Sequence, residues 1–318
     1  MAKVVSILVC TRNRAESLAG TIESLGALAV PAGFILELLI VDNGSTDNTP
    51  ELLRKTRLPN MTLRVLREEQ PGQCRSYNRA IAAVAGDILL FTDDDVRPSK
   101  DWVQKMIAPI QSGEADAVTG GIRMAAHLNR PWIEEIHRDW LACSDGVTPK
   151  SGVVLVGANM AISRRVLEKV AGFDPEMGPG AIGHASDTLF SIQLKKAGCR
   201  LVAVPDAWVV HHFGPDRLTR RAFEHQAVKR GEYNAYIAHH WYHVDFRLPR
   251  VRVVREWLRL QAARLLRLPE WLRHASVPTW ELLLLETFHT FRCYLKERRR
   301  PRNYERHGLV KLSHKTHC

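Results

Sequence analysis

The sequence lacks the patterns that mark several common classes of protein. No stretch reaches the roughly 18–20 consecutive apolar residues that cross a bilayer, and the N-terminus has no basic-then-apolar signal pattern. There is no Gly-rich phosphate loop ending in Lys, and no segment of about 20–50 residues repeats. These absences argue against a spanning helix, a P-loop and a solenoid. We expect a cytoplasmic protein, with a peripheral location on the cytoplasmic face of a membrane as a second option.

Cysteine is scarce and scattered. None of the six cysteines forms a pair at the two-residue spacing of zinc ribbons and redox sites, so a reducing compartment is expected. The composition, 45% hydrophobic and 25% charged residues in a chain of 318, is that of a folded protein with a sizeable core. This length allows about two domains, or one large α/β unit with an appendage.

Charge is distributed unevenly along the chain. The net charge is +11, and residues 216–318 contain 22 Lys and Arg against 10 Asp and Glu. The preceding 215 residues contain 23 against 24 and are nearly neutral. A negatively charged partner should therefore be sought at the C-terminal third.

Short β-rich runs alternate with amphipathic segments in the first half of the chain. This alternation predicts βαβ units and a mostly parallel, Rossmann-like sheet flanked by helices. Later segments continue the pattern with two helices, Arg164–Val170 and Ser186–Ala197. The predicted strands are Val4–Cys10, Ile35–Val41, Thr62–Leu66, Asp87–Thr92, Ala117–Ile122, Val153–Ile162, Arg200–Val204 and Ala207–Val210.

Polar clusters follow three of the predicted strands. They are Thr11 to Arg14 after the first, Asp42 and Asn43 after the second, and Asp93 to Asp95 after the fourth. Open α/β sheets bind ligands beyond the carboxyl ends of their strands, so one cleft is expected to collect all three clusters.

The aspartate run Asp93 to Asp95 is the clearest chemical signal. Like charges a few ångström apart raise one another's pKa, and a divalent cation relieves that repulsion. Mg²⁺ or Mn²⁺ commonly binds through one or two carboxylates together with substrate phosphates. The run therefore predicts a cation that holds a diphosphate and stabilises it as a leaving group. A solvated acidic turn is the alternative.

Asp42 allows two interpretations. Its carboxylate could accept an N–H from a pyrimidine base or a hydroxyl from ribose. The turn-forming sequence from Asp42 to Ser45 is equally typical of an Asx-turn.

Several ordered blocks between Val4 and Pro215 together resemble one family. They are Ser6 to Arg14, Ile40 to Asp47, Pro71-Gly72, Asn78 to Ile81, Gly86 to Val96 with its Asp-Asp-Asp run, Gly157 to Ala161, and Gly172-Phe173-Asp174. Their order and spacing resemble the glycosyltransferase family 2 proteins, nucleotide-sugar enzymes with the GT-A fold. The resemblance implies a GT-A catalytic domain over residues 1–215.

The resemblance also implies roles for individual residues. Nucleotide binding falls to Thr11, Arg12, Arg14, Asp42, Asn78, Arg79, Asp93 and Asp94, with Asp42 at the base and Asp93 at the ribose or sugar. Asp95 would ligate the metal, Mn²⁺ or Mg²⁺, as part of a DXD motif. Asn78 and Arg79 fall where the family has an Arg-Asn pair, and Tyr77 stands where Arg is common.

The catalytic base of similar inverting enzymes comes from an acidic pair that opens a later helix. Asp187 matches that aspartate, whereas Ser186 replaces a common Glu and Leu189 a frequent second acid. The alternative for Asp187 is a residue favoured at a helix N-terminus by the macrodipole. His211 follows the last predicted strand, where relatives often carry a metal-binding histidine.

Two further segments each have two interpretations. Trp132, His137, Asp139 and Trp140 lie in an insert that faces the acceptor in this family, and they either contact an acceptor sugar or pack in the core. Residues 216–318 form a basic amphipathic helical region in which Arg alternates with Leu, Val and Trp. These helices either lie on a membrane surface or pack on the catalytic domain or a second subunit. No nucleic-acid motif is present, and no nucleic-acid partner is expected.

The leading hypothesis is an inverting, metal-dependent glycosyltransferase. It moves a sugar from a nucleoside diphosphate sugar, UDP- or dTDP-linked, to a hydroxyl of a glycan or lipid-linked acceptor. The alternatives are a non-catalytic glycan- or membrane-binding protein that retains the fold, and a phosphoryl- or nucleotidyltransferase.

Overall fold

The computed structural model describes residues 3–147, 152–309 and 311. Cys318 and the other residues at the end of the expected C-terminal region, 310 and 312–318, lie outside the described residues. The strands are β1 (Lys3–Thr11), β2 (Phe34–Asp42), β3 (Thr62–Arg67), β4 (Ile88–Asp93), β5 (Val96–Pro98), β6 (Ala117–Met124), β7 (Asn159–Ser163) and β8 (Leu201–His211). The α-helices are α1 (Ala15–Gly26), α2 (Thr49–Lys55), α3 (Gln73–Ala83), α4 (Trp102–Gln111), α5 (Glu135–Trp140), α6 (Ser186–Lys196), α7 (Arg220–Tyr236), α8 (Pro249–Leu266), α9 (Leu268–Arg273) and α10 (Thr279–Glu297).

The strands form one mixed sheet in the order β3-β2-β1-β4-β7-β6-β8-β5. The pairs β1·β2, β1·β4, β2·β3 and β6·β8 are parallel, whereas β4·β7, β6·β7 and β5·β8 are antiparallel. The expected mostly parallel α/β architecture is confirmed. Because β1, β2 and β4 run parallel, their carboxyl ends meet at one edge.

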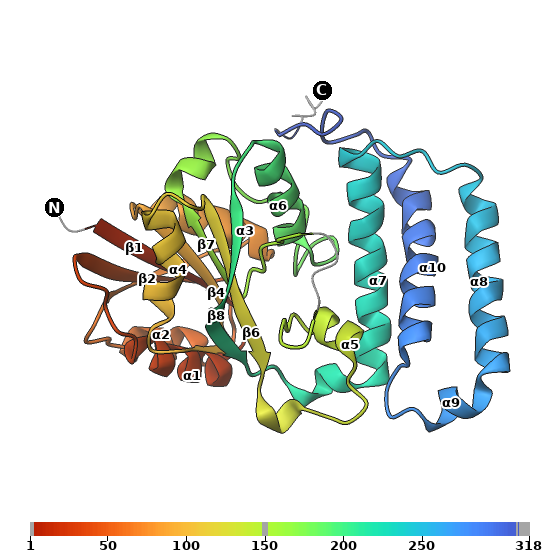
Figure 1. The fold of residues 1–318 in the computed structure, drawn as a ribbon, viewed down its shortest axis with the longest axis horizontal. Coiled ribbons are helices and arrows are strands. Elements are labelled where there is room, and N and C mark those ends of the chain that lie inside the picture. Colours follow the sequence, from red (N-terminus) through yellow and green to blue (C-terminus); the bar gives the residue numbers. More distant parts are fainter. Residues whose placement is uncertain (1–2, 148–151, 310, 312–318) are drawn as a thin grey trace.

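Helices cover both faces of the sheet (Figure 1). Along β1, Val5 and Ile7 pack with residues of α1 and α4, while Leu8 packs on the other face with residues of α3 and α6. Alternate residues of a strand point to opposite faces, so a strand covered on both sides must be apolar throughout. This explains the continuous hydrophobic run in β1.

Two predicted elements differ from the structure. The strand expected over Val153–Ile162 begins only at Asn159, because backbone N–H groups before it bond to side chains of α6 instead of to a neighbouring strand. Arg164–Val170 forms a short 3-10 helix over Arg164–Glu168.

The two last predicted strands are one strand. Residues 201–211 form β8 without interruption, although Pro205 has no backbone N–H to donate. The pairing register between β6 and β8 shifts between Gly120 and Ile122, so the extra residues of β8 around Pro205 form a bulge.

The C-terminal helices stand beside the sheet, with α10 between α7 and α8 (Figure 1). Phe223 of α7 packs with Trp140 of α5, which joins this helical layer to the rest of the chain. Within the described residues, no helix combines the length and apolarity required to cross a membrane.

Gly231 allows α7 and α10 to approach closely. A Cβ atom added there would lie 2.5 Å from the backbone carbonyl carbon of His289. That distance is far inside van der Waals contact, and the obstacle is helix backbone that cannot rotate away.

Gly231→Ala should therefore destabilise the protein, although the same change in an open helix is stabilising. We expect the free energy of unfolding to fall by about 1–3 kcal/mol through overpacking, measured by urea denaturation. Arg221→Ala, at an exposed position of the same helix, should change it by less than about 0.5 kcal/mol. A stabilised Gly231→Ala variant would contradict the described packing.

Candidate functional site

A cavity of about 1250 Å³ opens between the carboxyl edge of the sheet and the C-terminal helices. The loops after β1, β4 and β8 line one side, and residues of α5, α6, α7 and α10 line the other. Ligand pockets commonly measure roughly 300–1,000 Å³, so this cavity has room for more than one small ligand.

The aspartate run lies at the floor of the cavity, where β4 ends. Thr11 donates its hydroxyl to Asp94 (2.6 Å), and one guanidinium nitrogen of Arg14 lies 2.6 Å from Asp94 and 2.9 Å from Asp95. His211, at the end of β8, places Nε2 3.3 Å from Oδ1 of Asp95. The clusters after β1 and β4 therefore converge as the sequence predicts, Asn43 from the cluster after β2 also lines the cavity, and His211 joins them where the resemblance implied.

The three carboxyl groups differ in pKa. Burial, followed by the charges of Asp95 and Asp94, raises the pKa of Asp93 to about 7. Burial also raises the pKa of Asp94, although Arg14 opposes the shift. Burial acts in the same direction on Asp95, but the contact with His211 and the charge of Arg14 outweigh it and hold its pKa below the ordinary value. Asp95 is accordingly the carboxylate best suited to carry a permanent negative charge.

Asp187 lies in the first turn of α6 and lines the same cavity. The backbone N–H of Gly157 donates to its Oδ2 (2.9 Å), and that of Thr188 donates to its Oδ1 (2.8 Å). Burial raises the pKa of Asp187 despite these hydrogen bonds. A carboxylate with a raised pKa is a stronger base, and each oxygen retains capacity for another hydrogen bond.

Three predicted nucleotide-binding residues do not line this cavity. Asp42 accepts the Ser45 N–H (2.8 Å), as in an Asx-turn, and lies 3.7 Å from Arg67. Asn78 holds the backbone of Phe173 through both its amide oxygen and its amide nitrogen. Arg79 faces Glu68 on the surface (3.4 Å).

The cavity is also lined by residues that the sequence analysis did not predict as site residues. Gln73 and Tyr77, four residues apart on α3, each lie 3.4 Å from Oδ1 of Asp93. Tyr77 thus occupies the place expected for an arginine. Arg217 and Arg230 reach the wall from the C-terminal region. No local motif marks these positions, because tertiary packing alone brings them here.

The insert residues divide between the two expected roles. His137 is fully buried, lies 2.7 Å from the carbonyl oxygen of Val277 through Nε2, and packs against Trp132. Asp139 and Trp140 line the cavity instead. The Arg230 guanidinium lies 4.8 Å from the Trp140 ring centroid.

The residues present fit a divalent metal only as a partial ligand set. Oδ1 of Asp95 is buried and faces Nε2 of His211 at 3.3 Å, while Nδ1 of His211 is buried and has no hydrogen-bond partner among the residues that the structure describes. In that part of the chain, no group of three or more His, Cys, Asp or Glu side chains is arranged to hold a metal. A carboxylate with an imidazole beside it suits a cation that takes its other oxygen ligands from a bound diphosphate.

The comparisons with known proteins identify the class. The family model for glycosyl transferase family 2 matches residues 6–171, just over half of the chain. The chain therefore belongs to glycosyl transferase family 2, and the resemblance found in the sequence is confirmed.

Curated relatives agree with this assignment. Glycosyltransferase AglE of Haloferax volcanii is 31% identical over 120 residues, covering 37% of this chain and 39% of that protein. Succinoglycan biosynthesis protein ExoM of Rhizobium meliloti is 29% identical over 212 residues, covering 64% and 65%. The matched regions thus span less than two thirds of these relatives.

A solved structure shares the fold over most of its length. The mannosyltransferase PcManGT of Pyrobaculum calidifontis, in complex with GDP-Man and Mn²⁺, superposes with a TM-score of 0.61 at 20% identity. The match covers 92% of this chain and 87% of that one, and confirms the expected GT-A type of fold.

Removing the positive charge of Arg14 tests the electrostatics of the cavity floor. In metal-free buffer at pH 7, Arg14→Met should lower the free energy of unfolding by about 2 kcal/mol, because two buried carboxylates lose their cation. This is below the cost of breaking a fully buried pair, since the Arg14 side chain is 42% exposed. The decrease in the free energy of unfolding should become smaller as pH falls, because a protonated Asp94 no longer needs a cation beside it.

The exposed neighbour Arg12 provides the control for this urea-denaturation experiment. Arg12→Met should change the free energy of unfolding by less than about 0.5 kcal/mol. Equal losses in the two variants would contradict a specific role of Arg14.

Proposed function

We propose that the protein is an inverting, metal-dependent glycosyltransferase. It transfers a sugar from a nucleoside diphosphate sugar to a hydroxyl of a glycan or lipid-linked acceptor. The observation that carries this proposal is the convergence of Asp187, with its raised pKa, and the Asp93 to Asp95 run on one cavity of a family 2 chain. The mannosyltransferase with GDP-Man and Mn²⁺ supports the donor class and the metal.

Residues 1–215 form the donor-binding catalytic domain in this proposal, and residues 216–318 the helical region that closes the cavity. Thr11, Arg12, Arg14, Asp93 and Asp94 contact the nucleotide. Asp42 lies directly before Asn43, which does line the cavity, so Asp42 shapes the base site from behind. Arg79 reaches the base site only indirectly, through Glu68, whose carbonyl oxygen accepts the Asn43 amide, and Asn78 holds the backbone of Phe173. The donor is a UDP- or dTDP-sugar.

Asp95 and His211 would hold Mn²⁺ or Mg²⁺ together with the donor diphosphate. The cation supplies neutralisation of the negative charge that develops on the leaving group. Arg14 now occupies the space between Asp94 and Asp95, so it shares that role and can turn toward the diphosphate.

Asp187 is the base. The acceptor oxygen attacks the anomeric carbon as the bond to the diphosphate oxygen breaks, and the acceptor proton passes to an Asp187 oxygen. The Gly157 and Thr188 N–H groups fix the carboxylate in place. Because burial raises its pKa, transfer should be lost on acidification at a higher pH than for an ordinary aspartate.

Two substitutions separate the roles of the carboxylates. Asp187→Asn should lower transfer by at least about 100-fold, since it removes the base, and should leave nucleotide binding within about twofold. Asp95→Ala should weaken both transfer and Mn²⁺-dependent nucleotide binding. Turnover of a panel of nucleoside diphosphate sugars with and without Mn²⁺, alongside calorimetry with UDP, measures these effects.

Two outcomes would contradict these roles. Unchanged transfer in Asp187→Asn would remove the base assignment. Nucleotide binding without hydrolysis or transfer of any donor would favour a non-catalytic binding protein with the same fold.

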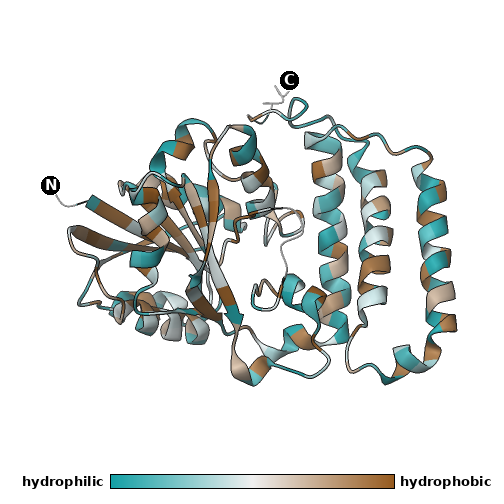
Figure 2. Cartoon of the chain, in the orientation of Figure 1, coloured by the Kyte–Doolittle hydropathy of each residue, from teal (hydrophilic) through white to brown (hydrophobic). Residues whose placement is uncertain are grey.

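The outer face of α8 is the part of the C-terminal region that suits a membrane surface. Val251, Val254, Leu258 and Leu265 lie on one face at helical spacing and are 54–74% exposed. Leu260, on the opposite face, is buried. Figure 2 shows hydrophobic and hydrophilic residues alternating along the helix that Figure 1 labels α8.

Charge favours an anionic lipid surface as the occupant of this face. Residues 249–273 contain seven arginines and two glutamates, and Glu256 is buried against Arg255 and Arg259. An apolar stripe flanked by cations matches the geometry of helices that lie in the bilayer interface. The protein would thus work peripherally on the cytoplasmic face, close to a lipid-linked acceptor.

Leu258→Glu/Leu265→Glu should reduce co-sedimentation with phosphatidylcholine/phosphatidylglycerol vesicles at least about fivefold, since negative charges replace two exposed apolar side chains that would insert into the bilayer interface. Val30 is also exposed and apolar but lies near the N-terminus, outside α8. Val30→Glu is therefore the control and should bind the vesicles as the parent protein does. Vesicle binding that depends neither on the anionic lipid nor on the two leucine substitutions would contradict the proposal. A dimer that dissociates in the double variant would instead assign this face to a second copy.

A further inference from the structure

The loop that leads into α6 is rich in glycine and needs contacts with other segments to keep one conformation. Between Asp174 and Asp187 the backbone has positive φ at Gly178 (+90°), Gly180 (+86°) and Gly183 (+61°). Glycine loses more conformational freedom on folding than any other residue, so a loop with three of them does not hold one shape by itself. Residues 174–185 are called the α6 entry loop below.

The α6 entry loop touches the active site at two places. The carbonyl of Pro179 accepts the backbone N–H of Gln73 (3.0 Å), and the Gln73 side chain in turn lies beside Asp93. At its far end the loop passes directly into the first turn of α6, which carries Asp187. A displacement of the loop therefore moves the proposed base, whereas Gln73 belongs to α3 and loses only this one backbone hydrogen bond.

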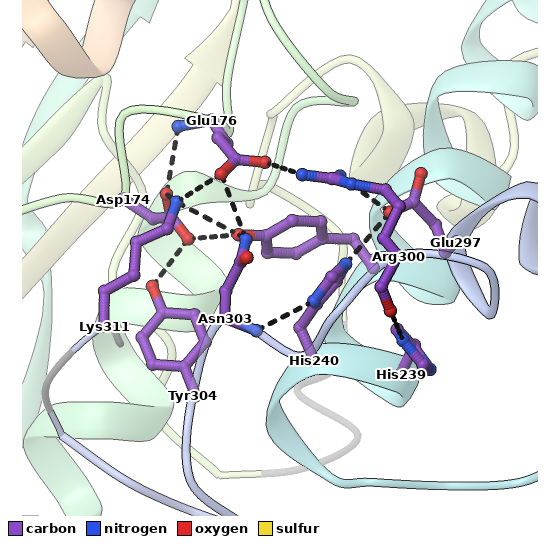
Figure 3. A network of polar contacts seen from close by, with 10 residues as sticks. Asp174, Glu176, His239, His240, Glu297, Arg300, Asn303, Tyr304 and Lys311 are labelled. Carbon is purple, nitrogen blue, oxygen red and sulfur yellow. Dashed lines mark hydrogen bonds and ion pairs between the residues drawn. The ribbon is translucent and has the colours of Figure 1, made fainter. Parts of the chain in front are cut away.

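Asp174 anchors the start of the loop to residues from distant parts of the chain (Figure 3). Its carboxylate accepts the hydroxyls of Tyr236 (2.5 Å) and Tyr304 (2.6 Å), the Lys311 ammonium (2.6 Å) and the Glu176 N–H (2.9 Å). Burial and then the Asp174 charge raise the pKa of both tyrosines, so each remains a donor. Four donors satisfy the full acceptor capacity of a carboxylate.

Glu176 provides a second anchor two residues further on. It accepts from Asn303 (3.1 Å) and Lys311 (2.8 Å) and forms an ion pair with Arg300. Burial opposes its ionisation, but these cations and hydrogen bonds lower the pKa of Glu176 to about 2. Glu176 is thus ionised at neutral pH.

The chain after α10 is itself fixed to the end of α7 and to the π-helical turn Ile237–Trp241. The Asn303 N–H donates to Nδ1 of His240 (3.1 Å), and Nε2 of His240 lies 3.0 Å from Glu297. Arg300 also pairs with Glu297 (2.8 Å). The segment cannot move without breaking these contacts.

An apolar cluster completes the connection to the base. Met177 of the entry loop, Leu189 of α6, Tyr236, Trp241 and Tyr304 pack together and are almost fully buried. Leu189 lies two residues after Asp187 in the same helix. Tyr304 therefore reaches both the charged anchor of the loop and the helix that carries the base.

We propose that Arg300, Asn303, Tyr304 and Lys311, which follow α10 in the chain, act as a clasp that positions Asp187 for proton removal from the acceptor. These four are positioning residues, because none of them lines the cavity. This inference rests on the proposed function for the role of Asp187. Donor contacts at Thr11, Arg14 and Asp95 come from other elements, so the clasp acts on the chemical step and leaves donor binding alone.

Tyr304→Phe tests the clasp, because it removes one hydroxyl from Asp174 and keeps the ring in the apolar cluster. Misplacing a reacting group by about 1 Å can cost about 100-fold in rate, so we expect kcat to fall about 10-fold or more. The donor KM and the UDP dissociation constant should stay within about twofold. The acid limb of the kcat–pH profile should also shift, since the surroundings of Asp187 change.

Arg302→Ala is the matched control. Arg302 belongs to the same segment but pairs with exposed Asp245, and among the described residues no hydrogen bond or ion pair joins it to the entry loop. This variant should keep kcat, KM and the pH profile of the parent. Equal losses of kcat in Tyr304→Phe and Arg302→Ala, or a Tyr304→Phe variant that raises KM alone, would overturn the clasp.

Amide hydrogen exchange makes the test independent of turnover. In Tyr304→Phe, residues 176–187 should exchange at least about tenfold faster, whereas β1 and β4 keep their protection. If the parent turns over no donor, the proposed function fails and this exchange pattern still decides whether the clasp holds the loop. Unchanged exchange in 176–187 would overturn the clasp even in an active enzyme.

Discussion

The cavity floor is organised by the cost of burying three adjacent carboxyl groups at the end of one strand. Asp94 and Asp95 are almost completely enclosed, and such charges persist only beside cations or as protonated acids. Arg14 supplies the positive charge and His211 a polar contact to Asp95, and they arrive on the loop after β1 and at the end of β8. The sheet topology is what brings these two strand ends to the same place.

The C-terminal helices are part of this site and not an attachment to it. Arg217 and Arg230 enter the cavity wall, and Phe223 packs in the cluster that holds the insert. Much of the basic charge of this region is therefore used internally: Arg220 and Arg264, for example, meet the fully buried Glu281. Five of the other arginines lie on the outer helices: Arg250, Arg252, Arg255 and Arg259 on α8 and Arg273 on α9.

The departures from the family pattern have a structural reason. Leu189, at a position where a second acid is frequent, is buried with Tyr236 and Tyr304, and a charge there would be left without a partner. Tyr77, which stands where Arg is common, lies against Asp93 and packs on Phe91. Both changes accompany contacts that the rest of this chain provides.

The sequence by itself determined the α/β class, the positions of most strands along the chain, and the family. Each of these depends on local periodicity or on motifs that are continuous in the chain. It also indicated that Thr11, Arg14 and Asp95 would meet, since strand ends share an edge, and the family resemblance added Asp187 and His211. Only the tertiary structure decided that Asp42, Asn78 and Arg79 turn away from the cavity, and that Gln73, Tyr77 and Arg217 enter it. The same holds for the contacts of Tyr304 with Asp174, 130 positions apart. Side-chain direction depends on packing between segments distant in sequence, and no local pattern encodes such packing.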